Sequence, residues 1–220
     1  MIISEIFEFL QLLDSDLYYY IEKFGIYIYF LLFAIVFGKT GFVILTFLPG
    51  DSLVFASGAI AAMDQLSLLN LFFIFFIATS LADSNNYLIG KSIRNIPSEN
   101  SHLMKIIPIQ ALDKARIFLN DYDKVAITFS RFIPLMRTMM PFIAGFTGYS
   151  YRSFVSYNLL GAFVWTSIWL GTGFAIGNMS WVKGNLLFTL SFITIVMFIP
   201  SICGFVVSFK KNKLETKMKS

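Results

Sequence analysis

The sequence predicts an all-α polytopic membrane protein with about four full transmembrane helices and two opposed re-entrant helical hairpins, arranged as an inverted repeat. Three observations support this fold class. The composition is too apolar for a soluble core of 220 residues, with 57% hydrophobic residues, 14% charged residues and a mean hydropathy of +0.73. Two apolar stretches contain charges together with helix-breaking residues, and the two halves of the chain share a faint repeat.

The N-terminal segment 1–23 mixes apolar and acidic side chains at helical spacing, so we expect an amphipathic helix on the membrane surface. No basic residue precedes Lys23, so the positive n-region of a cleavable signal peptide is missing. The apolar run 24–38, together with 18–21, is expected to form the first span and to serve as an uncleaved signal.

The next apolar stretch is predicted to form a re-entrant hairpin over about 41–62. Its two arms, 41–49 and 52–62, are each about half the ~20 residues that a spanning helix needs. Pro49-Gly50 between the arms is a turn signal. Residues 66–90 are then long enough to cross the membrane as the second span.

The second half of the chain has the same pattern, with a hairpin expected over about 125–148. Its arms, 125–133 and 138–148, flank a turn that contains Pro134. Pro141 is counted with Pro49, Gly50 and Pro134 among the residues that break the short helices. The membrane domain 24–209 is completed by two further predicted spans, at 153–177 and 185–209.

Lysine and arginine are concentrated in the polar loop 91–124 and in the basic tail 210–220. With four spans, this loop, this tail and both termini fall on one side, which the positive-inside rule identifies as the cytoplasm. Basic clusters beside apolar spans favour contact with anionic lipid headgroups, so we expect membrane lipids as partners and no nucleic acid. Whether the chain forms a homo-oligomer is left open.

The repeat appears when Phe47-Leu-Pro49 is laid on Phe132-Ile-Pro134. Gly58 then aligns with Gly145, and Gly90 with Gly177, with the same separation of 32 residues in each half. In the predicted topology the two hairpins enter from opposite faces. Inverted repeats with broken helices that meet near the midplane are a recurring architecture of secondary transporters.

Four charged residues fall within the apolar sequence and are the candidate functional residues: Arg131, Arg137, Asp51 and Asp83. The two guanidinium groups suit phosphate or carboxylate oxygens, so they are predicted to bind an anionic headgroup, although a structural pairing with the two carboxylates is an alternative. Asp51 is predicted to exchange protons or cations or to cap the helix that follows. Asp83, with Asn85 and Asn86, either lines an exit path or, as we favour, caps the end of its helix.

The remaining residues do not indicate a catalytic or metal site. His102 is the only histidine and falls in the polar loop, and Cys203 is the only cysteine, so neither a metal cluster nor a cofactor is expected. An intramembrane lipid-modifying enzyme would need a nucleophile or general base that these residues do not offer. Aromatic side chains, including Trp165, are expected to face lipid or the interface.

Several segments together resemble the DedA family of bacterial membrane proteins, which share the VTT or SNARE-associated domain. The resemblance covers about residues 25–178 and rests on Phe37-Gly-Lys-Thr-Gly41, Phe47-Leu-Pro-Gly-Asp-Ser52, Ala82-Asp-Ser-Asn-Asn-Tyr-Leu-Ile-Gly90, Ser130-Arg-Phe-Ile-Pro134 with Arg137-Thr138, Pro141 and Ala144-Gly145, and Tyr157-Asn158 with Gly161 and Trp165. The resemblance implies a multi-pass protein of the bacterial inner (plasma) membrane with two opposed re-entrant loops. It also implies a role in envelope homeostasis, moving phospholipid or a polyprenyl-phosphate carrier between leaflets, in some members with the proton gradient.

One position departs from the family pattern. Lys39 stands where the family typically has an acidic residue that it pairs with the acid matched here by Asp51. Proton coupling is therefore in doubt for this chain. Lys39 is expected either to pair with Asp51 across the mouth of the hairpin or to lie in water outside the membrane.

The sequence thus favours a transporter or flippase-like protein that handles an anionic lipid headgroup, either undecaprenyl phosphate or a phospholipid. The main alternative is a non-transporting membrane organiser or scaffold. It would explain the basic surfaces but would leave the function of the intramembrane arginines unexplained. An intramembrane lipid-modifying enzyme is the weaker alternative.

Overall fold

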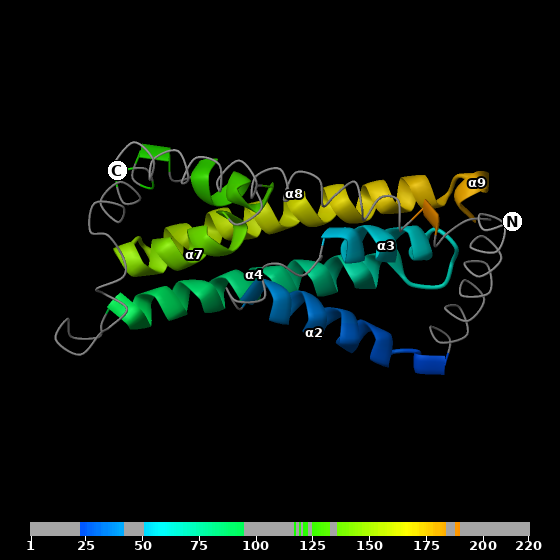
Figure 1. Cartoon of the computed structure of the whole chain (residues 1–220), viewed down its shortest axis with the longest axis horizontal. Helices are drawn as coiled ribbons and strands as arrows, with labels where there is room; N and C mark the ends of the chain where they lie inside the picture. Colours follow the sequence, from blue (N-terminus) through cyan, green and yellow to red (C-terminus); the bar gives the residue numbers. More distant parts are fainter. Residues whose placement is uncertain are drawn as a thin grey trace, which may run out of the picture.

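The computed structural model describes residues 23–41, 51–94, 125–132, 136–183 and 188–189, together with positions 117, 119, 121 and 122. Every regular element within these residues is a helix, as the sequence predicts (Figure 1). The basic tail, nearly all of the predicted surface helix and of the last span, and most of the polar loop lie outside the described residues, as do Pro49, Gly50 and Pro134.

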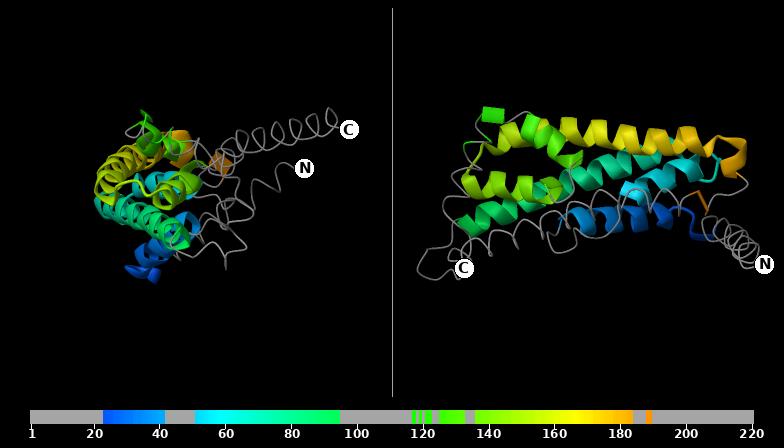
Figure 2. Two further views of the ribbon diagram at one scale, coloured as in Figure 1. Left: turned by 90° about the vertical axis from the view of Figure 1, so that its left-hand side faces the viewer. Right: turned by 45° about the horizontal axis from the view of Figure 1, so that its top comes forward.

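Two long antiparallel helices, α4 (Leu68–Arg94) and α8 (Tyr151–Gly177), form the centre of the fold (Figures 1 and 2). Each has 27 residues, which is about 40 Å at 1.5 Å per residue. Both are long and apolar enough to cross a bilayer. They match the predicted spans 66–90 and 153–177, except that α4 continues to Arg94.

The helix α2 (Tyr27–Gly41) packs on α4, on the side away from α8 (Figures 1 and 2). The chain turns at Gly25, where φ is 49°, a backbone conformation that glycine adopts without strain. Because of this turn, α2 has only 15 residues, about 22 Å, and is shorter than the first span that the sequence predicts.

Three shorter elements complete the part that positions the site: α3 (Asp51–Ala61), the 3₁₀ helix η3 (Ser130–Phe132) and α7 (Met136–Thr147). A four-residue helix, α9 (Ser180–Lys183), follows α8. The helices α3 and α7 match the predicted second arms of the two hairpins to within two residues.

The prediction that Pro141 breaks a helix is wrong, because Pro141 is buried within α7. Pro141 lacks an N–H and so cannot bond to the carbonyl of Arg137 four residues earlier. Only about one turn of α7 precedes it, so the first-turn carbonyl can tilt away from the proline ring without bending a longer helix. The helix therefore starts at Met136 and continues through the proline.

The short helices are exchanged between the two halves of the chain. The helix α3 makes its most extensive contacts with α8, whereas α7 makes its most extensive contacts with α4. Figure 1 shows them near opposite ends of the α4–α8 pair, with their first turns toward the middle. The four glycines of the predicted repeat lie at these contacts, where an added Cβ would overlap the backbone of the facing helix: Gly58, Gly90, Gly145 and Gly177.

The buried polar residues fall between two apolar clusters. One cluster contains Leu71, Phe75 and Ala78 from the first half of α4, and the other contains Tyr87 from its second half. Between Ala78 and Tyr87, Asp83 and Asn86 are almost fully buried. The apolar packing on both sides thus encloses a polar layer halfway along the bundle.

Candidate functional site

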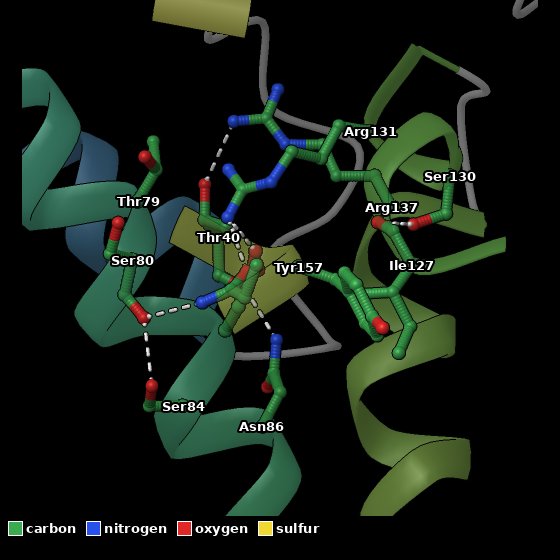
Figure 3. A network of polar contacts seen from close by, with 12 residues as sticks. Thr40, Thr79, Ser80, Ser84, Asn86, Ile127, Ser130, Arg131, Arg137 and Tyr157 are labelled. Carbon is green, nitrogen blue, oxygen red and sulfur yellow. Dashed lines mark hydrogen bonds and ion pairs between the residues drawn. The ribbon is translucent and has the colours of Figure 1, made fainter. Parts of the chain in front are cut away.

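The polar layer is formed by residues from six elements, and their hydrogen bonds and ion pairs form two neighbouring groups, one around Arg131 and one around Arg137. Figure 3 shows the two arginines reaching toward Thr40 and toward the face of α4 that carries Ser80 and Asn86. We define the polar layer as Thr40 on α2, Asp51 on α3, Ser80, Asp83 and Asn86 on α4, Arg131 on η3, Arg137 on α7, and Asn158 on α8.

Arg131 is enclosed between the two long helices. It forms an ion pair with Asp83, and both side chains are 1% exposed. Its Nη2 atom donates a hydrogen bond of 2.5 Å to Oδ1 of Asn158, whose Nδ2 donates at 3.1 Å to the carbonyl of Ser80. A buried charge without a partner is strongly destabilising, so these contacts hold Arg131 in place and connect η3 to α4 and α8.

Arg137 lies in the first turn of α7 and joins three other helices. Its Nη1 atom forms an ion pair with Oδ1 of Asp51, the first residue of α3. Its Nη2 atom donates to the Thr40 hydroxyl at 3.3 Å, and the guanidinium lies over the Trp165 ring at 4.2 Å from the centroid. The predicted site residues Arg137 and Asp51 are therefore brought together, as are Arg131 and Asp83.

The two ion pairs differ in exposure. The side chain of Asp51 is 36% exposed, whereas that of Asp83 is 1% exposed. The Arg137 side chain is 8% exposed and lies behind Asp51. The Arg137–Asp51 pair is thus the one that a molecule from outside can reach.

Lys39 also contacts Asp51, with its Nζ 3.9 Å from the same Oδ1 atom that Arg137 binds. The Lys39 side chain is only 10% exposed, so of the two expectations for this residue the structure selects the ion pair. Together with the polar layer, Lys39 brings the charges to three cations and two carboxylates. The site therefore has one positive charge in excess.

The prediction that Asp83, Asn85 and Asn86 cap the end of their own helix is wrong. They lie within α4, which continues to Arg94 because the residues after them remain apolar or pack on α7. The amides instead bond to the end of α2: Nδ2 of Asn86 donates to the Thr40 carbonyl at 2.7 Å, and Nδ2 of Asn85 to the Gly41 carbonyl at 2.9 Å. They satisfy carbonyls that a helix C-terminus leaves without a partner.

Buried donors without a hydrogen-bond partner outnumber such acceptors in the described part of the site. The donors include Nε of Arg137, Nε and Nη1 of Arg131, and the indole Nε1 of Trp165. The acceptors are Oδ1 of Asp83 and Oδ1 of Asn86, and the Ser80 hydroxyl, which can donate or accept, also has no partner. Since buried polar groups normally find partners, the unpaired Nε of Arg137 and the excess positive charge fit an oxygen-rich anion at Arg137.

Sequence reasoning missed Trp165, Asn158 and Thr40. Trp165 is fully buried beneath Arg137 and does not face lipid, while Asn158 and Thr40 supply partners to the two arginines. Asn158 and Trp165 belong to the motif of Tyr157-Asn158 with Gly161 and Trp165, which was the available signal for them. No pattern in the sequence indicated which aromatic ring lies against a guanidinium.

The described residues include no group of three or more His, Cys, Asp or Glu side chains placed to hold a metal ion. A pocket between the start of α4 and the second half of α8 is lined almost wholly by apolar groups and contains no residue of the polar layer: Leu68, Leu69, Phe72, Ser167, Leu170 and Gly171. Its lining offers no partner for a charged group.

Comparisons with known proteins place the chain in a family. A family model for the VTT domain matches residues 48–175. The chain is 33% identical to Protein DedA of Escherichia coli strain K12 over 197 residues, which is 89% of this chain and 90% of that protein. It is 28% identical to the inner membrane protein YghB of Salmonella typhimurium, over 84% of this chain and 86% of YghB.

The chain is also 26% identical to the inner membrane protein YqjA of Escherichia coli strain K12, again over 84% of this chain and 86% of the relative. No solved structure matches the chain. The VTT match extends from just before α3 to the end of α8 and thus includes most of the polar layer. The chain belongs to the VTT-domain family, which includes the DedA proteins.

Proposed function

We propose that this chain is a multi-pass protein of the bacterial inner membrane that moves an anionic lipid headgroup between the leaflets, with Arg137 as the headgroup-binding residue. The proposal includes a topology of four spans and two opposed re-entrant hairpins, with both termini in the cytoplasm. It is supported by the two spanning-length helices and by relatives whose names place them in the inner membrane. Undecaprenyl phosphate or a phospholipid supplies the headgroup.

The observation that carries the proposal is the Arg137–Asp51 pair in the middle of an apolar bundle, in which Arg137 is buried and Asp51 is partly exposed. A carboxylate and a lipid phosphate offer the same kind of oxygen to a guanidinium. A headgroup that reaches the opening can therefore replace Asp51 at Arg137, and Asp51 can displace the headgroup again. Such an exchange gives binding without leaving either charge unpaired for long.

The first turns of α3 and α7 add to this preference for anions. Both helices begin beside the Arg137–Asp51 pair, since Asp51 is the first residue of α3 and Arg137 the second of α7. Helix N-termini carry N–H groups without intrahelical partners and the positive end of the helix dipole. An anion at this point therefore faces a guanidinium and two helix N-termini.

Arg131 has a different part in this proposal, although the sequence groups it with Arg137. Its pair with Asp83 is fully buried and tied to Asn158, so replacing Asp83 by a headgroup would require the long helices to separate. We assign Arg131 and Asp83 to holding the site together, and Arg137 and Asp51 to exchange with the headgroup.

Native mass spectrometry of the full chain in a mild neutral detergent tests the proposal. A bound anionic lipid should accompany the wild-type protein and the Arg152→Gln variant, because Arg152 is exposed and lies outside the polar layer. It should be lost from Arg137→Gln. Reconstituted vesicles with a leaflet-selective anionic lipid reporter then measure movement.

Transbilayer movement no faster than in empty vesicles, combined with wild-type lipid retention in Arg137→Gln, would overturn the proposal. That outcome would favour a membrane organiser that does not transport.

A further inference from the structure

We propose that Lys39 is a second cationic ligand of the anion at Arg137, and that its charge lets this site hold a monoanion without taking up a proton. This inference rests on the proposed function. It adds Lys39 as a second residue that binds the anion, and it predicts that anion binding is not coupled to proton uptake. The observation behind it is that two cations from different helices share one carboxylate, Oδ1 of Asp51.

The geometry places Lys39 beside the opening. Lys39 lies in the last turn of α2, and its Nζ is 3.9 Å from the Asp51 atom that also accepts from Arg137. An oxygen that takes the place of this atom lies within reach of both cations. The Lys39 side chain is only 10% exposed, so water screens its charge only weakly.

The position of Lys39 is fixed by the fold. The amides of Asn85 and Asn86 bind the carbonyls of Gly41 and Thr40, directly after Lys39 in the sequence. The end of α2 is therefore held against α4, which fixes the backbone that carries Lys39 beside the site. A cation near a helix C-terminus is also favoured by the helix dipole.

The charge balance decides what the site can accept. The charged groups around Lys39 are Asp51 on α3 and Arg137 on α7, while Asp83 on α4 is already paired with Arg131 on η3. The sum is one excess positive charge, which a bound monoanion neutralises. With a neutral residue at position 39, the same monoanion would leave one excess negative charge in a poorly hydrated site, which protonation of a carboxylate would have to remove.

Phosphatidylglycerol is a suitable probe, because its phosphodiester keeps a single negative charge between pH 5.5 and 7.5. The purified full chain in a neutral maltoside detergent is titrated with this lipid at both pH values, and occupancy is read by native mass spectrometry. Phosphatidylcholine, which has no net charge, serves as the lipid control. Any dependence of affinity on pH then comes from the protein.

Wild-type affinity is expected to change less than about twofold between the two pH values, and Lys39→Arg should behave in the same way. Lys39→Gln should bind about tenfold more weakly at pH 7.5, as expected for the loss of one charge-assisted contact, and should recover at pH 5.5. Lys39→Glu should bind more weakly still and depend more steeply on pH. Lys91→Glu makes the same change of charge at an exposed position on α4 and should match the wild type.

Two results separate this inference from the function beneath it. Arg137-dependent binding that is unaltered in Lys39→Gln, or a wild-type affinity that falls tenfold from pH 5.5 to 7.5, overturns the role of Lys39 and leaves the headgroup site intact. If a variant does not fold, the pH dependence of wild-type affinity still tests the role of Lys39. If the wild-type protein binds phosphatidylglycerol no better than the Arg137→Gln variant, both the role of Lys39 and the headgroup site are overturned.

Discussion

Asp51 and Arg137 are 86 positions apart in the chain, yet their ion pair joins the first turn of α3 to the first turn of α7. These two helices pack on opposite long helices, so the pair connects the two halves of the fold at their meeting point. The carboxylate of Asp51 occupies the place that an external anion would need. Asp51 thus acts as an internal competitor for Arg137.

Removing this competitor should strengthen anion binding. Asp51→Asn keeps a side chain that can cap α3, but it no longer neutralises Arg137 and Lys39. Retention of phosphatidylglycerol in native mass spectrometry should rise about three- to tenfold, a moderate effect because Asp51 is partly exposed to water. The matched control is Asp64→Asn, at an exposed position where asparagine tolerates the positive φ of 59°. Weaker retention in Asp51→Asn would show that the carboxylate supports binding.

Breaking the buried pair should destabilise the fold. Arg131→Ala and Asp83→Ala each leave one charge buried without its partner, at a cost of about 3–5 kcal/mol. The double variant Arg131→Met/Asp83→Leu removes both charges and should recover most of the lost stability. Thermal unfolding in detergent, followed by fluorescence-detected size exclusion, measures the three proteins. If the losses of the single variants simply add in the double variant, the two residues do not act as a pair.

A glycine at a helix contact should not tolerate a methyl group. In Gly145→Ala the added Cβ would overlap the Tyr87 carbonyl, so α7 must move away from α4, at about 1–3 kcal/mol. Gly171 on α8 has no atom within 4 Å of an added Cβ, so Gly171→Ala should be neutral or stabilise by up to ~1 kcal/mol. Melting temperatures in the same detergent compare the two. Equal stability of both variants would contradict the close contact between α4 and α7.

The end of α2 should loosen when its amide partner is removed. Asn86→Ala leaves the Thr40 carbonyl without its bond, and the loss is expected to cost about 1–3 kcal/mol because the site is buried. Hydrogen exchange at the C-terminal turn of α2 should become faster. Asn70→Ala, at an exposed position near the start of α4, should leave this exchange unchanged. Unchanged protection in Asn86→Ala would mean that packing alone fixes α2.

The sequence predicted the elements whose signal is local. The predominantly apolar runs at 66–90 and 153–177 are long enough to span a membrane, and both form helices within four residues of the predicted bounds. The repeated glycines were also informative, since a position that admits no side chain indicates close helix packing. Pro141 was misjudged, because proline marks a helix break only when enough helix precedes it to be bent.

The polar run around Asp83 shows that a local sequence pattern does not identify the partners of buried polar groups. An acid and two amides near the expected end of a helix indicated a cap for that helix, but they lie within α4 and bond to Arg131 and to the end of α2. The partner of a buried polar group is chosen by packing between distant segments. In the same way, Lys39 could be placed beside Asp51 or in water until α2 was docked on α4.

The sequence by itself determined the family, the helical class and the four charged residues within apolar segments, because composition, spacing and motifs need no neighbours. Only the tertiary structure decided which arginine pairs with which acid, and that Asp83 is enclosed in its pair while Asp51 is partly exposed in the other. The physical reason is that solvent exposure and ion pairing depend on which helices pack together. Here α3 and α7 each pack on the long helix of the other half, so the charges that meet come from segments far apart in the chain.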